Sequence, residues 1–398
     1  MIRFLTAGES HGAALVVVLE GLPAGLEVEA DDIAAELARR RIGFGRGPRM
    51  RFEEDLVTIV GGVRHGRTLG SPVAVEIGNS EWTRNPERWG TEMSPAAADG
   101  PTKEPLTQVR PGHADLAGMQ KYGFVDARDV LERASARETA ARVAAGTLAK
   151  KLLGTVGVTV VSHVLQIGSV RVPRGVRPGA GDSERVDASE VRCIDDATAA
   201  AMIEEIRAAA KDGDSLGGIV EVVAYGVPVG LGSHVHWDRK LDAALARAVM
   251  SIQAVKGVEI GDGFEVAGRR GSDAHDALSW SDANGYERST TLAGGLEGGI
   301  STGGPIVVRA AMKPLATLNR PTLATVDVLS KQAGVSFKER TDVTAVPACG
   351  VVAEHMVALT LADEVARKFG GDSVDELLLN HRGFLDALAA GPVGPVGD

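Results

Sequence analysis

The sequence has only two cysteines, Cys193 and Cys349, among 398 residues. They lie far apart and in no metal-ligand spacing, so neither a disulfide framework nor a zinc knuckle is predicted. No segment offers the about 18 uninterrupted apolar residues of a membrane span, and the residues from Met1 to Glu9 lack the apolar run of a signal peptide. We therefore expect a soluble, cytoplasmic protein that is not exported.

The sequence also has fewer basic than acidic residues. The chain carries 43 Lys and Arg residues against 53 Asp and Glu residues, a net charge of −10. Nucleic-acid and anionic-membrane binders usually have a cationic excess, so neither partner is expected and any anion site must be local. The chain is 44% apolar and 24% charged, which is ordinary for a globular protein and sufficient for a large core. Its length alone leaves one or two domains open.

Local patterns predict the order of strands and helices. We expect a core strand from Ala13 to Leu22, directly after the polar turn Gly8–Gly12, and a helix from Ala30 to Arg41. Residues 83–108, rich in Pro, Gly and polar groups, predict a long loop. The other expected strands are at 57–63, 72–77, 155–172, 218–231 and 305–312, and the other expected helices are at 126–153, 202–210, 241–253, 350–369 and 374–389.

The predicted strands come mostly as turn-linked pairs and do not alternate strictly with helices. This order favours an α+β fold in which antiparallel sheets are sandwiched with helices. The glycine-rich segment Gly294–Gly304 precedes a strand and opens no helix, which excludes a dinucleotide-binding fingerprint. The tail Gly391–Asp398 is expected to be disordered.

Six arginines lie within thirteen residues, interrupted by three glycines: Arg39, Arg40, Arg41, Arg46, Arg49 and Arg51. Such a loop can bring several guanidinium groups onto one polyanion. Cations that complement a helix C-terminus explain Arg39 and Arg41 equally well. Glycine spacing is unnecessary for simple solvation, so a functional role is favoured for Arg46 and Arg49.

Two histidines occupy turns. His11 precedes the first core strand and His113 follows a Pro-Gly turn, and both can titrate near neutral pH, although an isolated histidine is more often structural. His234 and His236 would share one face of a strand, but with no third ligand evident no metal site is predicted. Arg133 and Arg137 are expected one helical turn apart, where they either hold a phosphate or are simply exposed.

Together these segments resemble chorismate synthase. The segments that carry the resemblance follow in family order between residue 2 and about residue 368: Gly8–Gly12, Arg39–Arg41, Gly45–Met50, Arg110–Asp115, Arg133–Thr139, Gly294–Gly304, Met312–Pro314 and Arg340–Val343. Taken alone, the loop at Lys313 or the loop at Arg340 would be a weak indication of a binding site. The chain departs from the family in having Gln253 and Thr302 where Asn is usual, and Thr341 where Ser is common.

The resemblance implies a single α+β domain over residues 1–390 and a homotetramer. It also implies a carbon–oxygen lyase of the shikimate pathway to aromatic amino acids, which turns 5-enolpyruvylshikimate-3-phosphate into chorismate by 1,4-anti elimination. Phosphate leaves C3 and a proton leaves C6. Reduced FMN is required, and the sequence leaves open whether the chain reduces FMN with NADPH or depends on a separate flavin reductase.

The same resemblance implies roles for individual residues. His11 would serve the departing phosphate, His113 would lie near the reduced flavin ring, and Asp342 would assist proton removal at C6 through the flavin. The substrate- and phosphate-binding residues would be Arg40, Arg46, Arg49, Arg137 and Arg340. The flavin contacts would be Arg133, Ala134, Ser135, Gln253, Ala254, Gly298, Lys313, Pro314, Leu315, Ala316, Thr317 and Arg340.

Two alternatives remain at this point. A flavin reductase would use the arginine clusters for FMN phosphate and a nicotinamide cofactor, and would oxidise NADPH rapidly as its main activity. A polyanion-binding module would use the arginines of residues 39–51 as its contact surface and need no flavin. The negative total charge disfavours the second alternative.

Overall fold

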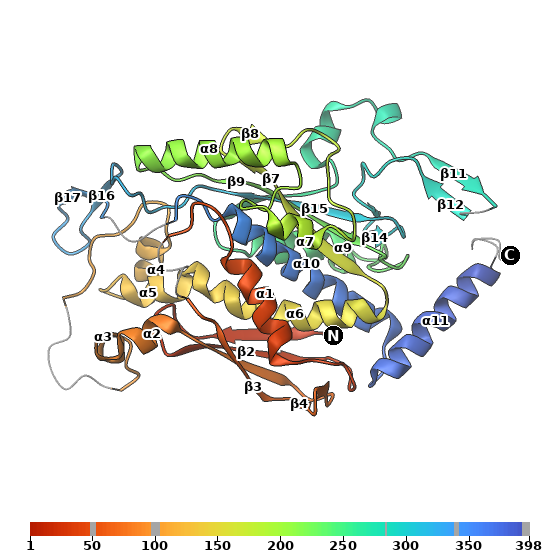
Figure 1. Cartoon of the computed structure of the whole chain (residues 1–398), viewed down its shortest axis with the longest axis horizontal. Helices are drawn as coiled ribbons and strands as arrows, with labels where there is room; N and C mark the ends of the chain where they lie inside the picture. Colours follow the sequence, from red (N-terminus) through yellow and green to blue (C-terminus); the bar gives the residue numbers. More distant parts are fainter. Residues whose placement is uncertain (48–52, 97–103, 283–284, 338–341, 392–398) are drawn as a thin grey trace.

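The computed structural model describes residues 1–47, 53–96, 104–282, 285–337 and 342–391. Its chain forms two larger antiparallel sheets with helices packed between and around them (Figure 1). The smaller of the two has the strand order β1 (Arg3–Ala7), β2 (Ala14–Glu20), β6 (Val73–Gly78) and β3 (Leu56–Gly61). Leu15, Val17 and Leu19 alternate with more exposed neighbours along β2, so one face of this sheet packs into the core.

The five-stranded sheet is the more deeply buried of the two. Its strand order is β10 (Val255–Ile260), β15 (Ile306–Met312), β9 (Gly218–Tyr225), β7 (Thr159–Ile167) and β8 (Val170–Arg171). Smaller two-stranded pairs are β4 (Val63–Arg64) with β5 (Arg67–Thr68), β11 (Leu278–Ser281) with β12 (Gly285–Arg288), β13 (Leu296–Glu297) with β14 (Ile300–Ser301), and β16 (Ala324–Val326) with β17 (Ala333–Val335).

The helices vary from single turns to a 24-residue core helix. The α-helices are α1 (Ala30–Arg41), α2 (Ser80–Arg84), α3 (Pro86–Glu92), α4 (Asp115–Tyr122), α5 (Arg128–Ala134), α6 (Thr139–Thr155), α7 (Ser183–Ala188), α8 (Asp196–Asp212), α9 (Leu241–Met250), α10 (Val346–Phe369) and α11 (Val374–Ala390). Short 3₁₀ helices are η2 (Ala136–Glu138), η3 (Trp237–Arg239), η4 (Gly263–Gly268) and η5 (Gly271–Asp273).

Helices α1, α6 and α10 lie between the two larger sheets (Figure 1). Helix α6 contacts β2 and α10, and α10 contacts β7 and β9. The two helices approach closely at Gly146, where an added Cβ would lie 2.4 Å from Cβ of His355. Helix α10 is long and apolar enough to span a membrane by composition, but 89% of its apolar window is buried inside the protein. It is therefore placed as a core helix.

The predicted α+β class with antiparallel sheets is confirmed, and helix α1 has the predicted bounds. Three local predictions were wrong. The expected loop at 83–108 contains the end of α2 and all of α3, which starts at Pro86, a residue suited to the first helical turn. The expected helix at 126–153 is broken at Ser135. His234 and His236 lie in no strand. The tail predicted to be disordered, Gly391–Asp398, lies outside the described residues except for Gly391.

Candidate active site

His11 lies in the polar turn between β1 and β2. Its main-chain N–H donates to Glu132 Oε2 at 2.9 Å, and its ring Nδ1 lies 2.9 and 3.0 Å from the two oxygens of that carboxylate. The ring stacks on Trp89 with the ring centroids 4.0 Å apart. Burial would raise the pKa of Glu132, but the hydrogen bonds and charge of His11, together with Arg128, hold that pKa below its usual value. The imidazole is thus held at one edge by a carboxylate and on one face by an indole.

The chain turns at Ser135, between α5 and η2. The Ser135 Oγ accepts a hydrogen bond from the Arg137 main-chain N–H at 3.3 Å and lies 3.2 Å from Ser10 Oγ. A serine hydroxyl that bonds to a nearby N–H competes with the helical hydrogen-bond pattern, which explains the break. Arg133 therefore does not share a helix face with Arg137: it donates to the Thr6 carbonyl at 2.7 Å.

Arg137 is buried and its charge is neutralised within the protein. Its guanidinium donates to Asn79 Oδ1 at 2.8 Å and to Asp55 Oδ1 at 2.5 Å, and it lies 3.5 Å from Glu53 Oε1. Asn79 also donates to the Gly12 carbonyl at 2.7 Å. Arg137 thereby braces the turn that carries His11, whatever else it binds.

Arg40 is a buried cation of a different kind. It donates to Thr139 Oγ1 at 2.9 Å and to the Ala136 carbonyl at 3.1 Å. Among the described residues, its buried NH1 group has no hydrogen-bond partner and no carboxylate lies within ion-pair distance. Burial and repulsion by Arg137 lower the pKa of the guanidinium to about 9. Among the arginines of the cluster that the structure describes, this side chain is therefore the best prepared for an anionic ligand.

Arg46 and Asp342 meet although they are far apart in sequence. Arg46 Nε lies 3.1 Å from Asp342 Oδ2, and the Gly47 main-chain N–H donates to Asp342 Oδ1 at 2.6 Å. This contact joins the arginine-rich loop to the segment before α10. Two other predicted site residues, Arg49 and Arg340, lie outside the described residues.

The predicted flavin contacts at Gln253, Ala254 and Lys313 also come together. Gln253 Nε2 donates to Glu138 Oε2 at 2.9 Å, and the Lys313 main-chain N–H donates to the Ala254 carbonyl at 3.0 Å. Lys313 Nζ in turn donates to the Gly112 carbonyl at 2.5 Å. The segment Lys313–Thr317 therefore lies beside the turn that carries His113, as an added Cβ at Gly112 would also contact Ala316.

His113 has a carboxylate partner similar to that of His11. Its Nδ1 lies 2.5 Å from Asp115 Oδ1, and Arg110 donates to both oxygens of the same carboxylate at 2.8 and 3.0 Å. Burial would raise the pKa of Asp115, but the hydrogen bonds from His113 and Arg110 hold it far below its usual value. An open groove of about 510 Å³ runs past His113, between α4 and β16, and includes Thr325 in its wall.

Gly298 is separated from the other predicted flavin contacts of the same chain. It lies in the turn between β13 and β14, beside His234, and the neighbouring Gly299 carbonyl accepts from the N–H of Leu241 at the start of α9. Gln253 and Ala254 follow the opposite end of this 10-residue helix. The length of α9, about 15 Å, separates the two groups.

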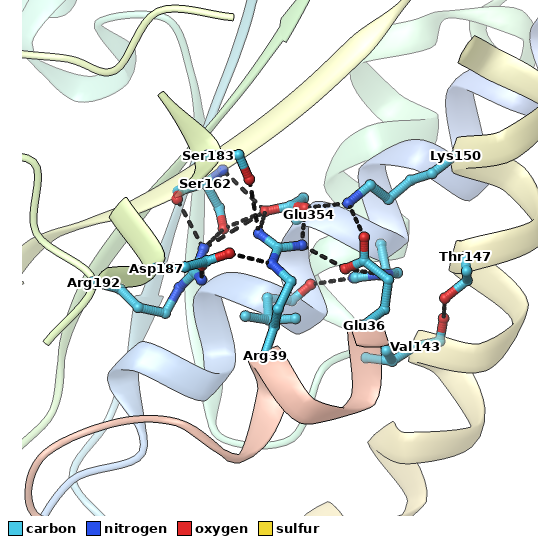
Figure 2. Close-up of polar contacts among 12 residues, drawn as sticks. Glu36, Arg39, Val143, Thr147, Lys150, Ser162, Ser183, Asp187, Arg192 and Glu354 are labelled. Carbon is cyan, nitrogen blue, oxygen red and sulfur yellow. Dashed lines mark hydrogen bonds and ion pairs between the residues drawn. The ribbon is translucent and has the colours of Figure 1, made fainter. Parts of the chain in front are cut away.

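Arg39 points into a buried ion-pair cluster (Figure 2). Its guanidinium donates to both oxygens of Glu354 at 2.7 and 3.1 Å and to Asp187 at 2.6 Å. Lys150 Nζ donates to the same Glu354 carboxylate at 2.7 Å. Adjacent arginines of this run therefore differ in role: Arg39 ties α1 to α10, and Arg40 faces the Ser135 turn.

Sequence reasoning did not predict Glu132, Trp89, Asn79 or Asp55 as part of the site. Glu132 adjoins the Arg133 motif and could have been noticed there. Asn79 and Asp55 stand in no motif, and only the folded chain brings them to Arg137.

Comparison with known proteins gives a consistent family assignment. The chorismate synthase family model matches residues 2–366. Chorismate synthases of Salinispora tropica and Thermobifida fusca are 60% and 59% identical to the chain over 395 and 396 residues, covering 98% of it and 99% of each relative. A solved structure titled as a crystal structure of chorismate synthase matches with a TM-score of 0.77 and 39% identity, covering 97% of both chains. The chain belongs to the chorismate synthase family.

Proposed function

We propose that Arg40 and the loops around it bind the phosphorylated substrate of the chorismate synthase reaction. The enzyme converts 5-enolpyruvylshikimate-3-phosphate to chorismate, with loss of phosphate from C3 and of a proton from C6. The observation that supports this role is the buried NH1 of Arg40, which has no hydrogen-bond partner among the described residues. A desolvated cation of this kind gains strongly from a phosphate or carboxylate ligand. Arg46 and Arg137 are proposed to contribute from either side, with Arg49 and Arg340 completing the set.

The residues present also fit FMN. The buried Gln253 Oε1 has no hydrogen-bond partner in the described part of the chain, and the carbonyl of the next residue, Ala254, accepts a hydrogen bond from the Lys313 main chain. We assign the flavin to Arg133–Ser135, Gln253, Ala254, Lys313–Thr317 and Arg340. Reduced FMN, when bound, supplies electron density to the substrate ring as phosphate departs. The chain's own groups hold the two anions together and exclude water.

The two histidines are proposed to act on different partners. His11 donates a proton to the departing phosphate, and His113, held by Asp115, keeps a proton at the flavin side of the site. Asp342 assists removal of the C6 proton. In the structure it lies against Arg46, which links it to the proposed phosphate-binding residues.

We further propose that residues 1–390 form one domain, with the helical layer sandwiched between the sheets, and that four chains assemble. One hydrophobic core cluster extends from the four-stranded to the five-stranded sheet, which supports a single domain. The separation of Gly298 from the other flavin contacts supports a site completed by a neighbouring chain. The two cysteines are free and buried, which supports a cytoplasmic location.

A fluorescence titration of FMN with and without substrate tests the shared pocket. Oxidised FMN alone should bind weakly, and substrate should tighten its binding, because each ligand completes part of the other's pocket wall. Equal flavin affinities under the two conditions would contradict the assignment. Anaerobic NADPH oxidation with FMN and no other protein separates a chain that reduces its own flavin from one that needs a reductase. NADPH oxidation without chorismate formation would instead favour the flavin reductase alternative.

A further inference from the structure

We propose that Glu132 is a positioning residue for His11, orienting the imidazole through Nδ1 and stabilising the protonated ring that delivers a proton from Nε2. This inference rests on the proposed role of His11 at the departing phosphate. Glu132 reaches the turn from α5, and its contact with His11 spans 121 positions of sequence.

The carboxylate holds both the main chain and the side chain of His11. Oε2 accepts the His11 main-chain N–H at 2.9 Å, and both oxygens lie within 3.0 Å of Nδ1. The Ser10 main-chain N–H donates to the Glu132 carbonyl at 3.0 Å, so the backbone of the turn is attached to α5 at two points in all. A carboxylate at Nδ1 requires a proton there, which fixes the tautomer and assigns proton delivery to Nε2.

The surrounding charges keep Glu132 ionised. Its side chain is 2% exposed, yet Arg128 NH1 lies 3.2 Å from Oε1, and Arg128 also lies 3.6 Å from Glu92. An ionised carboxylate beside Nδ1 can compensate a positive charge on the ring, because opposite charges attract strongly where water is excluded.

Trp89 fixes the remaining freedom of the ring. Its indole is 3% exposed and stacks on the imidazole with the planes inclined by 16°. Arg88 lies over the indole, 4.3 Å from its centroid, on the chain segment that forms α3. With Nδ1 held at the edge and one face covered, the ring has one direction left in which to present Nε2.

The proton transfer at the phosphate balances with His11 and solvent. As the C3–O bond breaks, its electron pair stays on the phosphate oxygen, and the Nε2 proton of His11 passes to the phosphate. The electron pair of the C6–H bond becomes part of the new diene, and that proton is accepted on the side of the site where Asp342 is proposed to assist its removal. His11 ends neutral, with Nδ1–H still donated to the Glu132 carboxylate, and regains its Nε2 proton from water.

Glu132→Gln tests the proposal, because glutamine keeps the size and removes the charge. We expect the single-turnover rate to fall by about 10–100-fold, the usual cost of losing the carboxylate behind a functional imidazole, with little change in substrate affinity. The alkaline limb of the pH–rate profile should differ from that of the parent, because the charge beside the ring is removed. Nitrogen NMR of His11 in the unliganded protein should show the Nδ1–H tautomer in the parent and a mixture of the two ring tautomers in the variant. Glu132→Asp should restore part of both properties.

Controls separate this inference from the proposed role of His11. Glu221→Gln removes another buried carboxylate that faces a histidine and arginines, on the five-stranded sheet, and should lower the melting temperature without moving the pH limb. His11→Ala should have a low single-turnover rate, and the double variant with Glu132→Gln should have the same rate as His11→Ala alone. If His11→Ala turns over like the parent, the role of His11 fails. The positioning role is wrong if His11→Ala is slow but Glu132→Gln keeps the parent's alkaline limb. It is also wrong if the rate of the double variant falls by the product of the two single-variant losses.

Discussion

At the scale of single residues, the arginines of the site differ in what their charge already contacts. Arg137 is neutralised by Asp55 and Glu53, and Arg39 by Glu354 and Asp187. Arg40 is buried without such a partner in the described chain. A buried, uncompensated charge costs stability, and proteins keep such groups chiefly where a ligand compensates them.

Arg40→Met should therefore weaken substrate binding without weakening the fold. A charge-assisted hydrogen bond contributes about 1.5–3 kcal/mol, so calorimetry should record a Kd raised by about 10–150-fold. The melting temperature should stay the same or rise, because a buried unpaired charge is replaced by an apolar side chain of similar length. Arg64→Met, at an exposed position on β4, is the control and should change neither quantity.

The pH dependence of binding follows from the same residue. The pKa of Arg40 is lowered to about 9 in the free protein, and an anionic ligand would raise it. The cation is therefore fully present below about pH 9, and substrate affinity should decrease as the pH rises above that value. An affinity that stays constant from pH 8 to pH 10 would contradict the assignment of Arg40 to the substrate.

The sequence motifs predict candidate site residues but not the neighbours that the folded chain brings to them. His11, Arg40 and His113 stand in motifs with unusual glycine, proline or arginine spacing. Asp55 is identified as a neighbour of the site only in the folded chain, where it contacts Arg137 across 82 positions of sequence. Pairwise contacts of this length leave no local pattern in the chain.

At the scale of elements, helix α1 shows how neighbouring residues take opposite roles. Arg39 points to Glu354 on α10 and Arg40 points to the turn before α6. Ser162 of β7 also donates to Glu354, through both its N–H and its hydroxyl. The Glu354 carboxylate thus joins α1, α6, α10 and β7, and fixes the helix from which Arg40 projects (Figure 2).

Glu354→Gln should destabilise the protein strongly. It leaves the half-buried Arg39 and Lys150 beside a neutral amide at the buried end of each pair, and breaking a buried ion pair costs about 3–5 kcal/mol. The melting temperature should fall by several degrees in calorimetry. The pKa of Glu354 is held well below its usual value, above all by Lys150 and Arg39 against the effect of burial. Its contribution is therefore present above about pH 4.5 and lost as the pH falls further.

Melting temperatures measured as a function of pH test the role of this cluster further. The difference between parent and Glu354→Gln should be full at neutral pH and shrink in acid. Glu204→Gln, which removes one partner of an exposed pair with Arg207, should leave the melting temperature unchanged. A Glu354→Gln protein as stable as the parent at pH 7 would show that the cluster does not hold α1.

Helices and strands were largely predictable where the spacing of apolar residues and the residues typical of helix ends indicated the same bounds. Helix α1, with aspartates in its first turn and arginines in its last, is an example. The helix expected at 126–153 failed because its composition favours helix throughout, while one serine hydroxyl and the contacts of Arg137 break it at Ser135. Helix α3 was missed because Pro and Gly indicate loops on average, although Pro86 here starts a helix anchored by buried Trp89.

At the scale of the whole molecule, the outer face of the four-stranded sheet carries exposed apolar residues. Leu5, Leu56 and Val60 are 69%, 72% and 66% exposed, and they lie on the face opposite the core. Such a surface is costly in water and typical of an interface between subunits. Leu56→Glu should therefore reduce the mass of the proposed tetramer in light scattering, because it places a charge in the buried contact.

Leu379→Glu, on the exposed face of α11, is the matched control and should keep the parent's mass. A parent chain that is monomeric, or a Leu56→Glu variant with the same mass as the parent, would contradict the proposed interface. The number of subunits was implied by family resemblance alone, because oligomeric state has no signature in the composition of one chain.

The central claim is that this site eliminates phosphate with reduced FMN, with His11 serving the phosphate and His113 the flavin. The most direct test is an anaerobic single-turnover measurement on the parent, His11→Ala and His113→Ala, following chorismate and the bound-flavin spectrum together. The parent should form chorismate only with reduced FMN. His11→Ala should be slower by about 10²–10⁴-fold with an unchanged flavin spectrum, whereas His113→Ala should change both the rate and the spectrum. Absence of chorismate from the parent, or parent rates in both variants, would contradict the account.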